Sequence, residues 1–135
     1  MNIQIARQYT VFLPNIPGAL HKFIDLFTKE KINIIGIASE IRDDSGIIKI
    51  AVEVDKKISY ILTNAGFTTV ETPMLSIDLT DKPGELLALT KVLAENNINI
   101  TTVYGSTLEI NKPSRILLNV SDATKAMDIL KRENI

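Results

Sequence analysis

Cysteine is absent from the 135 residues, and histidine occurs once, as His21. Without cysteine the chain can form no disulfide, thiolate metal site or cysteine nucleophile. A single imidazole also excludes every site that needs two of them, and most acid–base schemes that rely on histidine. The composition therefore argues against a conventional hydrolase or metalloenzyme. We expect no catalytic residue, no bound metal and no cofactor.

The chain also lacks an excess of one charge and any long apolar run. Its 15 Lys and Arg residues nearly balance its 16 Asp and Glu residues. Proteins that wrap nucleic acid usually show a clear basic excess, so we expect no nucleic-acid partner. No apolar run approaches the length of a membrane span, and residues 1–10 lack the basic-then-apolar order of a signal peptide. We expect a cytoplasmic protein without a membrane partner.

What the sequence does contain is an internal repeat. Residues 15–34 (NIPGALHKFIDLFTKEKINI) match residues 81–100 (DKPGELLALTKVLAENNINI) at a constant offset of 66. After two extra residues around 111–113 the offset becomes 68, and the apolar residues at 48, 50 and 52 match those at 116, 118 and 120. The chain is therefore two copies of one unit, which we place at residues 1–70 and 71–135.

Each copy predicts the element order β-α-β-β-α-β. Alternating apolar residues predict strands at 47–54 and 75–79, and further strands are expected at 33–41 and 67–71. Apolar residues at helical spacing predict that the first helix of each copy buries one stripe: Leu20, Ile24 and Phe27, or Leu86, Leu89 and Leu93. The pattern indicates an α+β fold, in which the helices cover one face of an antiparallel sheet.

Polar residues precede all four predicted helices and are expected to cap them. Asn15 and Asp81 come before the first helix of each copy, and Asp55 and Asp122 come before the second. The side chains of Asn and Asp commonly accept hydrogen bonds from the free N–H groups at a helix start. Gly66 is expected to end the second helix of copy one.

Copy two reaches Ile135 before a fourth strand of its own. In this fold the fourth strand lies beside the first, so residues 75–80 would form an exposed edge. We expect either residues 67–71 or the N-terminal strand 3–13 to cover it, from the same chain or from a second one. Because a second chain could supply the covering strand, we expect a homodimer or a higher oligomer.

The strongest local signal is the junction of the first strand and first helix, Asn15-Ile-Pro-Gly18 in copy one and Asp81-Lys-Pro-Gly84 in copy two. These residues can have a purely structural role, which is to end the strand and start the helix. The same geometry can also serve a ligand, because N–H groups at a helix start beside a glycine without a Cβ suit a carboxylate.

A strand that ends in (D/N)-x-P-G-x-L, followed by a helix and by the triplet INI, resembles the ACT domain, a small-molecule regulatory module. The pattern occurs twice and the similarity covers nearly the whole chain. The chain therefore looks like a stand-alone protein of two tandem ACT domains. The resemblance implies ferredoxin-like βαββαβ units paired side by side, with an amino acid or similar small effector bound at the interface between ACT units.

The resemblance also implies which residues contact the effector. In ACT domains that bind amino acids, contacts come from the loop Asn or Asp, the backbone near the Gly, and a polar residue that opens strand two. In this chain the matching positions and their neighbours are Asn15, Ile16, Gly18, Ala19 and Asn33 in copy one, and Asp81, Gly84 and Asn99 in copy two. The carboxylate of Asp81 would repel that of a ligand unless it faces the ligand's amino group, so copy one is the expected binding copy.

Two functions fit these expectations better than any other. The first is a non-catalytic regulatory protein that binds an amino acid. The alternative is a regulatory subunit that docks on a separate enzyme of amino-acid metabolism and transmits effector binding to it. An enzyme on the same scaffold fits least, because no loop gathers an Arg, an Asn and a carboxylate.

Overall fold

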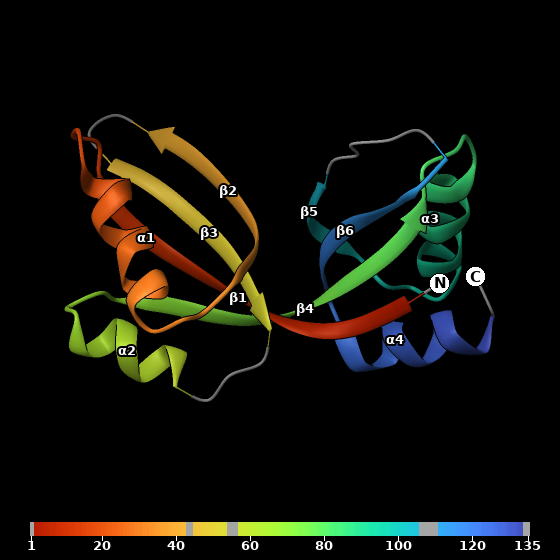
Figure 1. Cartoon of the computed structure of the whole chain (residues 1–135). Helices are drawn as coiled ribbons and strands as arrows, with labels where there is room; N and C mark the ends of the chain where they lie inside the picture. Colours follow the sequence, from red (N-terminus) through yellow and green to blue (C-terminus); the bar gives the residue numbers. More distant parts are fainter. Residues whose placement is uncertain (1, 43–44, 54–56, 106–110, 134–135) are drawn as a thin grey trace. The chain divides into compact units, whose positions relative to one another are not determined.

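The computed structural model of the chain describes residues 2–42, 45–53, 57–105 and 111–133 (Figure 1). The elements in chain order are β1 (Asn2–Pro14), α1 (Ala19–Lys29), β2 (Ile34–Arg42), β3 (Ser45–Glu53), α2 (Ile58–Asn64), β4 (Thr69–Thr80), α3 (Glu85–Glu95), β5 (Ile100–Gly105), β6 (Pro113–Val120) and α4 (Ala123–Arg132). The predicted α+β class and the repeated element order are confirmed. No helix within the described residues is long and apolar enough to cross a membrane.

The chain divides into two compact units, and its described strands lie in one sheet of the order β2-β3-β1-β4-β6-β5. The first unit comprises residues 7–72, and the second comprises residues 1–6 together with 73–135. The strand order is β2-β3-β1-β4 in the first unit and β1-β4-β6-β5 in the second. Strands β2 and β3, β4 and β6, and β5 and β6 pair antiparallel. Each order is that of a ferredoxin-like unit.

Strands β1 and β4 each contribute to both units, which the sequence prediction did not include. The strands expected separately at 67–71 and 75–79 form one continuous strand, β4. The predicted division at residues 70 and 71 differs from the units of the structure, because residues 1–6 belong to the second unit. These residues lie beside β4, in the position that β4 takes beside β1 in the first unit.

The edge that we expected to be exposed is covered by β1 of the same chain. Ile3 is only 8% exposed and belongs to the core of the second unit. At the same edge, the side-chain amide of Asn2 donates a hydrogen bond to the carboxylate of Asp78 (Nδ2 to Oδ2, 3.4 Å). The edge therefore gives no reason for an oligomer, and the homodimer or higher oligomer stays a prediction without this support.

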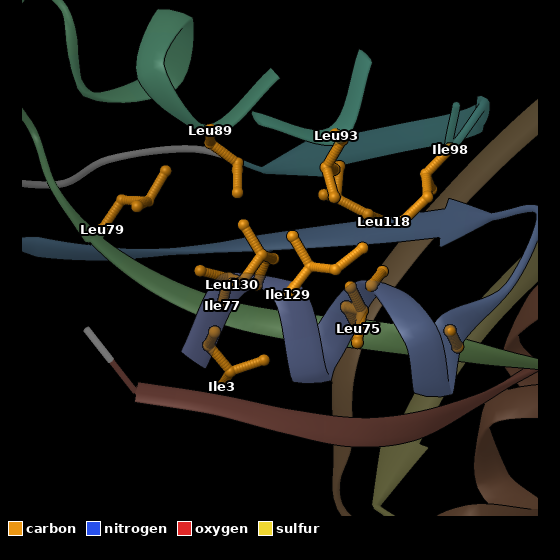
Figure 2. Packing of buried hydrophobic residues seen from close by; sticks show 12 residues of the cluster. Ile3, Leu75, Ile77, Leu79, Leu89, Leu93, Ile98, Leu118, Ile129 and Leu130 are labelled. Atoms are coloured by element: carbon orange, nitrogen blue, oxygen red, sulfur yellow. The ribbon is translucent and has the colours of Figure 1, made fainter. Parts of the chain in front are cut away.

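The core of the second unit collects apolar residues from β1, β4, β6, α3 and α4 on one face of the sheet (Figure 2). Alternate residues of β4 and residues of both helices contribute to it: the cluster includes Leu75, Ile77, Leu79, Leu89, Leu93, Leu118, Ile129 and Leu130. Figure 2 shows Ile3 directed from β1 into the same cluster. This burial explains why residues 1–6 belong here.

The equivalent core of the first unit contains a group of packed aromatic side chains. Phe23 and Phe27 on α1 are buried, and their ring centroids lie 5.3 Å apart in an edge-to-face arrangement. Phe67 contacts Phe23 in the same manner at 5.2 Å. The predicted burial of Leu20 and Leu86 is wrong, since these side chains are 43% and 48% exposed. Both lie within the first turn of their helices, beside the loop that enters the helix, and the core begins one turn later.

Each first helix ends in the same hydrogen-bonded turn. Lys31 and Asn97 both have φ of 58°, in the left-handed region. The N–H of Ile32 donates to Phe27 O (2.8 Å), and that of Ile98 donates to Leu93 O (2.9 Å). This is the Schellman arrangement, in which an apolar residue follows the left-handed one and packs back on the helix. It explains the first Ile of the repeated INI triplet.

The predicted cap of α4 is confirmed, because the N–H of Lys125 donates to Asp122 Oδ1 (3.0 Å). Asp55 lies outside the described residues, and α2 has Lys57 at its N-cap position. Gly66 ends α2 as predicted, with φ of 90°.

Lys31→Gly is expected to stabilise the protein. A left-handed conformation costs a residue with a Cβ about 1–2 kcal/mol. Glycine removes this strain and adds an entropic cost of about 0.5–1 kcal/mol in the unfolded chain, so we expect a net gain of about 0.5–1 kcal/mol. Asn97→Gly is the matched control and should gain less, because Asn tolerates this conformation. Urea unfolding of both variants measures the difference, and equal gains would contradict the explanation.

Candidate functional site

The loop between β1 and α1 is a tight backbone turn that positions the helix start. The N–H of Ile16 donates to Pro14 O (2.9 Å), and the N–H of Ala19 donates to Ile16 O (3.3 Å). Gly18 occupies the N-cap position of α1 with φ of 88°, and its carbonyl accepts from the N–H of Lys22 (3.0 Å). The left-handed φ favours glycine at this position.

The loop between β4 and α3 repeats this geometry. Gly84 is the N-cap with φ of 94°, and its carbonyl accepts from the N–H of Ala88 (2.9 Å). The N–H of Lys82 donates to Thr80 O (3.0 Å), as the N–H of Ile16 does to Pro14 O in copy one. The two Pro-Gly motifs therefore fold alike, and differences between the loops come from their side chains.

The predicted caps at Asn15 and Asp81 are wrong. No described side chain caps α1 or α3, whose N-cap residues are the glycines. A capping side chain has to sit at the N-cap itself to reach the first turn, and Asn15 and Asp81 lie three residues before it. Among the described residues, the N–H groups of Leu20 and His21 therefore have no hydrogen-bond acceptor.

Two pockets border the loop in the first unit. The one that we call the loop pocket has a volume of about 240 Å³ and is lined by Leu13, Pro14, Ile16, Pro17, Gly18, Ala19, Lys22 and Phe67. The strand pocket has a volume of about 210 Å³ and is lined by Leu13, Pro14, Asn15, Ile16, Ala19, Leu20, Ser39, Ile41, Gly46 and Ile48. Pockets for drug-sized ligands span roughly 300–1,000 Å³, so these suit a smaller molecule.

The structure brings together four of the five residues suggested in copy one. Gly18 lines the loop pocket, Asn15 lines the strand pocket, and Ile16 and Ala19 line both. Asn33 lines neither of them. It follows the C-terminal end of α1, whose 11 residues span about 16 Å. One unit therefore does not bring Asn33 to its own loop.

The loop of copy two forms hydrogen bonds and an ion pair within the second unit. The backbone of Asp81 is paired with the β6 hairpin, since the N–H of Asn111 donates to Asp81 O (2.9 Å) and the N–H of Asp81 donates to Lys112 O (3.0 Å). Glu85 lies in the first turn of α3 and forms an ion pair with Lys82 (3.4 Å). A carboxylate at this position already complements the positive end of the helix.

Asn99, the last residue suggested in copy two, connects β5 with the end of β6. Its N–H donates to Ser121 Oγ (3.1 Å), and its carbonyl accepts from the N–H of Ser121 (2.9 Å). Gly84 lies at the far end of α3 from Asn99, as Gly18 does from Asn33 on α1. The backbone of Asn99 therefore has a structural role here.

Five residues that line the loop pocket were not predicted, and two of them, Lys22 and Phe67, lie outside the segment 13–19. Lys22 lies four residues after Gly18 on α1, and residues at this spacing share one face of a helix, so the spacing could have indicated it. Phe67 comes from the segment between α2 and β4, and only the tertiary fold brings it to the loop. Leu13, Pro14 and Pro17 complete the lining as neighbours of the motif.

The second unit holds a partly buried phenol, that of Tyr104. Tyr104 Oη donates to Met74 Sδ (3.6 Å), and burial raises the pKa of Tyr104 to about 12. The phenol therefore stays protonated at neutral pH and is poorly placed for acid–base work. Asn119 donates to Pro73 O through Nδ2 (3.3 Å). Within the described residues, no group of three or more His, Asp or Glu side chains could hold a metal ion.

Comparison with known proteins agrees with this architecture. A family model described as an ACT domain pair matches residues 3–135. A comparison with curated protein sequences finds no match.

Several solved structures share the fold. A protein from Bacteroides thetaiotaomicron has 24% identity and a TM-score of 0.84, with 99% of this chain and 92% of that chain covered. The ligand-free regulatory subunit of aspartate kinase from Thermus thermophilus has 13% identity and a TM-score of 0.69, covering 98% and 96%. A structure of aspartokinase alpha and beta subunits has 18% identity and a TM-score of 0.65, covering 100% and 99%. At these identities the likeness shows the fold.

Proposed function

Since this chain belongs to the ACT domain pair family, we propose that it is a non-catalytic regulatory protein that binds an amino acid. One observation carries the proposal, which is the pair of hollows beside the Pro14–Ala19 loop of the first unit. They lie at the motif Asn15-Ile-Pro-Gly18, which resembles that of the ACT domain. Their size suits a small effector better than a nucleotide or a peptide.

We place the effector on the loop of copy one. The glycine at position 18 leaves the helix start open, and the N–H groups of Leu20 and His21 are free for an acceptor among the described residues. The first turn of α1 contains no acidic residue. In copy two, Glu85 and Asp81 put negative charge in the same region. The expected position of the effector at an interface of ACT units stays a prediction.

A thermal-shift screen of the purified protein against the twenty amino acids tests this proposal. A ligand at about a hundred times its Kd stabilises the folded state by about 2.7 kcal/mol. For a chain of this length the melting temperature should rise by roughly 5–10 °C. We expect at least one amino acid to give such a rise. If none does, at concentrations up to 10 mM or so, the proposed effector class is wrong.

A second candidate function is that of a regulatory subunit on a separate enzyme of amino-acid metabolism. It is supported by the nearly complete mutual coverage with a chain described as the regulatory subunit of aspartate kinase. Purification of the tagged chain from its native cells distinguishes the two candidates. A large enzyme that always accompanies the chain supports the subunit, whereas recovery of the chain alone favours a stand-alone effector-binding protein.

A further inference from the structure

We propose that the loop pocket of the first unit selects a small carboxylate with an apolar side chain, and that Lys22 pairs with the carboxylate. This inference rests on the proposed function and adds the chemical class of the effector. It concerns residues of the first unit alone.

The walls of the loop pocket are apolar. Leu13 is 5% exposed at the end of β1, and Phe67 is held edge-to-face against Phe23 at 5.2 Å, so both present fixed apolar surfaces. Ile16 is 61% exposed and lines the pocket, so a bound ligand would cover part of its side chain. A polar ligand side chain placed against these walls would lose its hydrogen bonds to water without replacement. An apolar one would gain by covering exposed apolar surface.

Lys22 provides the charge that a carboxylate needs. Of the described residues that line the loop pocket, Lys22 alone is charged. It makes no ion pair with any described residue. The acidic residue that follows it on α1, Asp25, is engaged with Lys29 at 3.1 Å. The ammonium group is therefore free to pair with a ligand.

The equivalent positions in the second unit carry the opposite charge pattern. At the offset of 66, Ala88 replaces Lys22 and Glu85 replaces Ala19. The positive group is lost and a negative group, paired with Lys82 at 3.4 Å, stands at the helix start. The same carboxylate would be repelled there. We therefore expect one ligand per chain, bound in the first unit.

Calorimetric titration with leucine, phenylalanine and serine tests the class of side chain. Two analogues of leucine separate its functional groups: leucinamide removes the carboxylate charge, and 4-methyl-2-oxopentanoate removes the amine. We expect leucine or phenylalanine to bind at one per chain, with serine and leucinamide at least tenfold weaker. Tighter binding of the oxo acid than of leucine would indicate that the effector is an oxo acid with an apolar side chain. The carboxylate and the apolar side chain would still be recognised in the same way.

Lys22→Met tests the role of the charge, since Met keeps the apolar stem of the side chain. The matched control is Lys91→Met, which removes an exposed cation from α3, outside the pocket. We expect Lys22→Met to weaken binding of the carboxylate about tenfold, in the range of a charged hydrogen bond, and to leave leucinamide unaffected. Lys91→Met should leave both affinities unchanged.

Three results would overturn the inference. Preferred binding of serine or another polar amino acid would refute the apolar class while leaving the proposed function standing. Unchanged carboxylate affinity in Lys22→Met would refute the role of Lys22 in the same way. A lack of response to all twenty amino acids and to the oxo acid would refute the proposed function itself, and the inference with it.

Discussion

Gly18→Leu is expected to abolish effector binding, whereas Gly84→Leu should leave binding intact at a similar loss of stability. Both glycines have a positive φ, 88° and 94°, and a Cβ at either would meet no described atom within 4 Å. The backbone strain is therefore alike, about 1–2 kcal/mol for a residue with a Cβ in this region. Gly18 lines the loop pocket, so its new side chain would occupy the space of the ligand.

The comparison separates binding from folding because each variant is the stability control of the other. Urea unfolding should give similar decreases in the free energy of unfolding for both proteins. Calorimetry at a temperature where both are folded should then show binding only for Gly84→Leu. Equal affinities in the two variants would place the effector away from the loop of copy one.

Ile3→Ala is expected to destabilise the second unit by about 2–4 kcal/mol, as for other large apolar residues in a core. Ile3 is 8% exposed, and it contributes to a cluster whose other strand residues come from β4 and β6 (Figure 2). A unit of this size has a small core, so its free energy of unfolding is low. Gln4→Ala is the matched control, because the exposed side chain of Gln4 lies next to Ile3 on β1. It should change stability by less than about 0.5 kcal/mol.

Hydrogen exchange locates the effect of Ile3→Ala within the chain. We expect faster exchange in β4 from residue 75 onward and in β6, which belong to the second unit. Exchange in β2 and β3 of the first unit should change less. Uniform acceleration across both units, or none, would contradict the assignment of residues 1–6 to the second unit.

The fold could be predicted from the sequence because the repeat carries its own turn chemistry. Gly18 and Gly84 fix the entry of the first helices, and Lys31 and Asn97 take the same left-handed conformation at their ends. The helix starts were predicted less well, since the left-handed glycine moves the N-cap three residues beyond Asn15 and Asp81. Leu20 and Leu86 were then counted as core residues, although they lie beside the loops.

The division of β1 between the units could not be read from the sequence. Residues 2–14 form one strand with no glycine or proline before Pro14, so no local signal separates residues 2–6 from the rest. The sequence left residues 67–71 and the N-terminal strand as two expected covers for the edge at residues 75–80. The N-terminal strand is the cover, because β1 lies beside β4 in the sheet. This pairing joins residues far apart in the sequence, and no local pattern predicts it.

The candidate site was predicted in part. The motif indicated the residues of the loop, and the structure gathers Asn15, Ile16, Gly18 and Ala19 around two hollows. The apolar wall from Phe67 depends on the packing of the segment after α2 against the loop. A sequence pattern confined to the first helix contains no information on that contact.

The most direct test of the account is a map of backbone NMR shifts on titration with the amino acid that gives the largest thermal shift. The account predicts that the largest changes cluster at Leu13, Ile16, Gly18, Ala19 and Lys22, with Phe67 among the affected residues. The matching residues of copy two, Gly84, Glu85 and Ala88, should change little. Shift changes centred on residues 81–88, or spread evenly over the chain, would contradict the claim that the loop of copy one binds the effector.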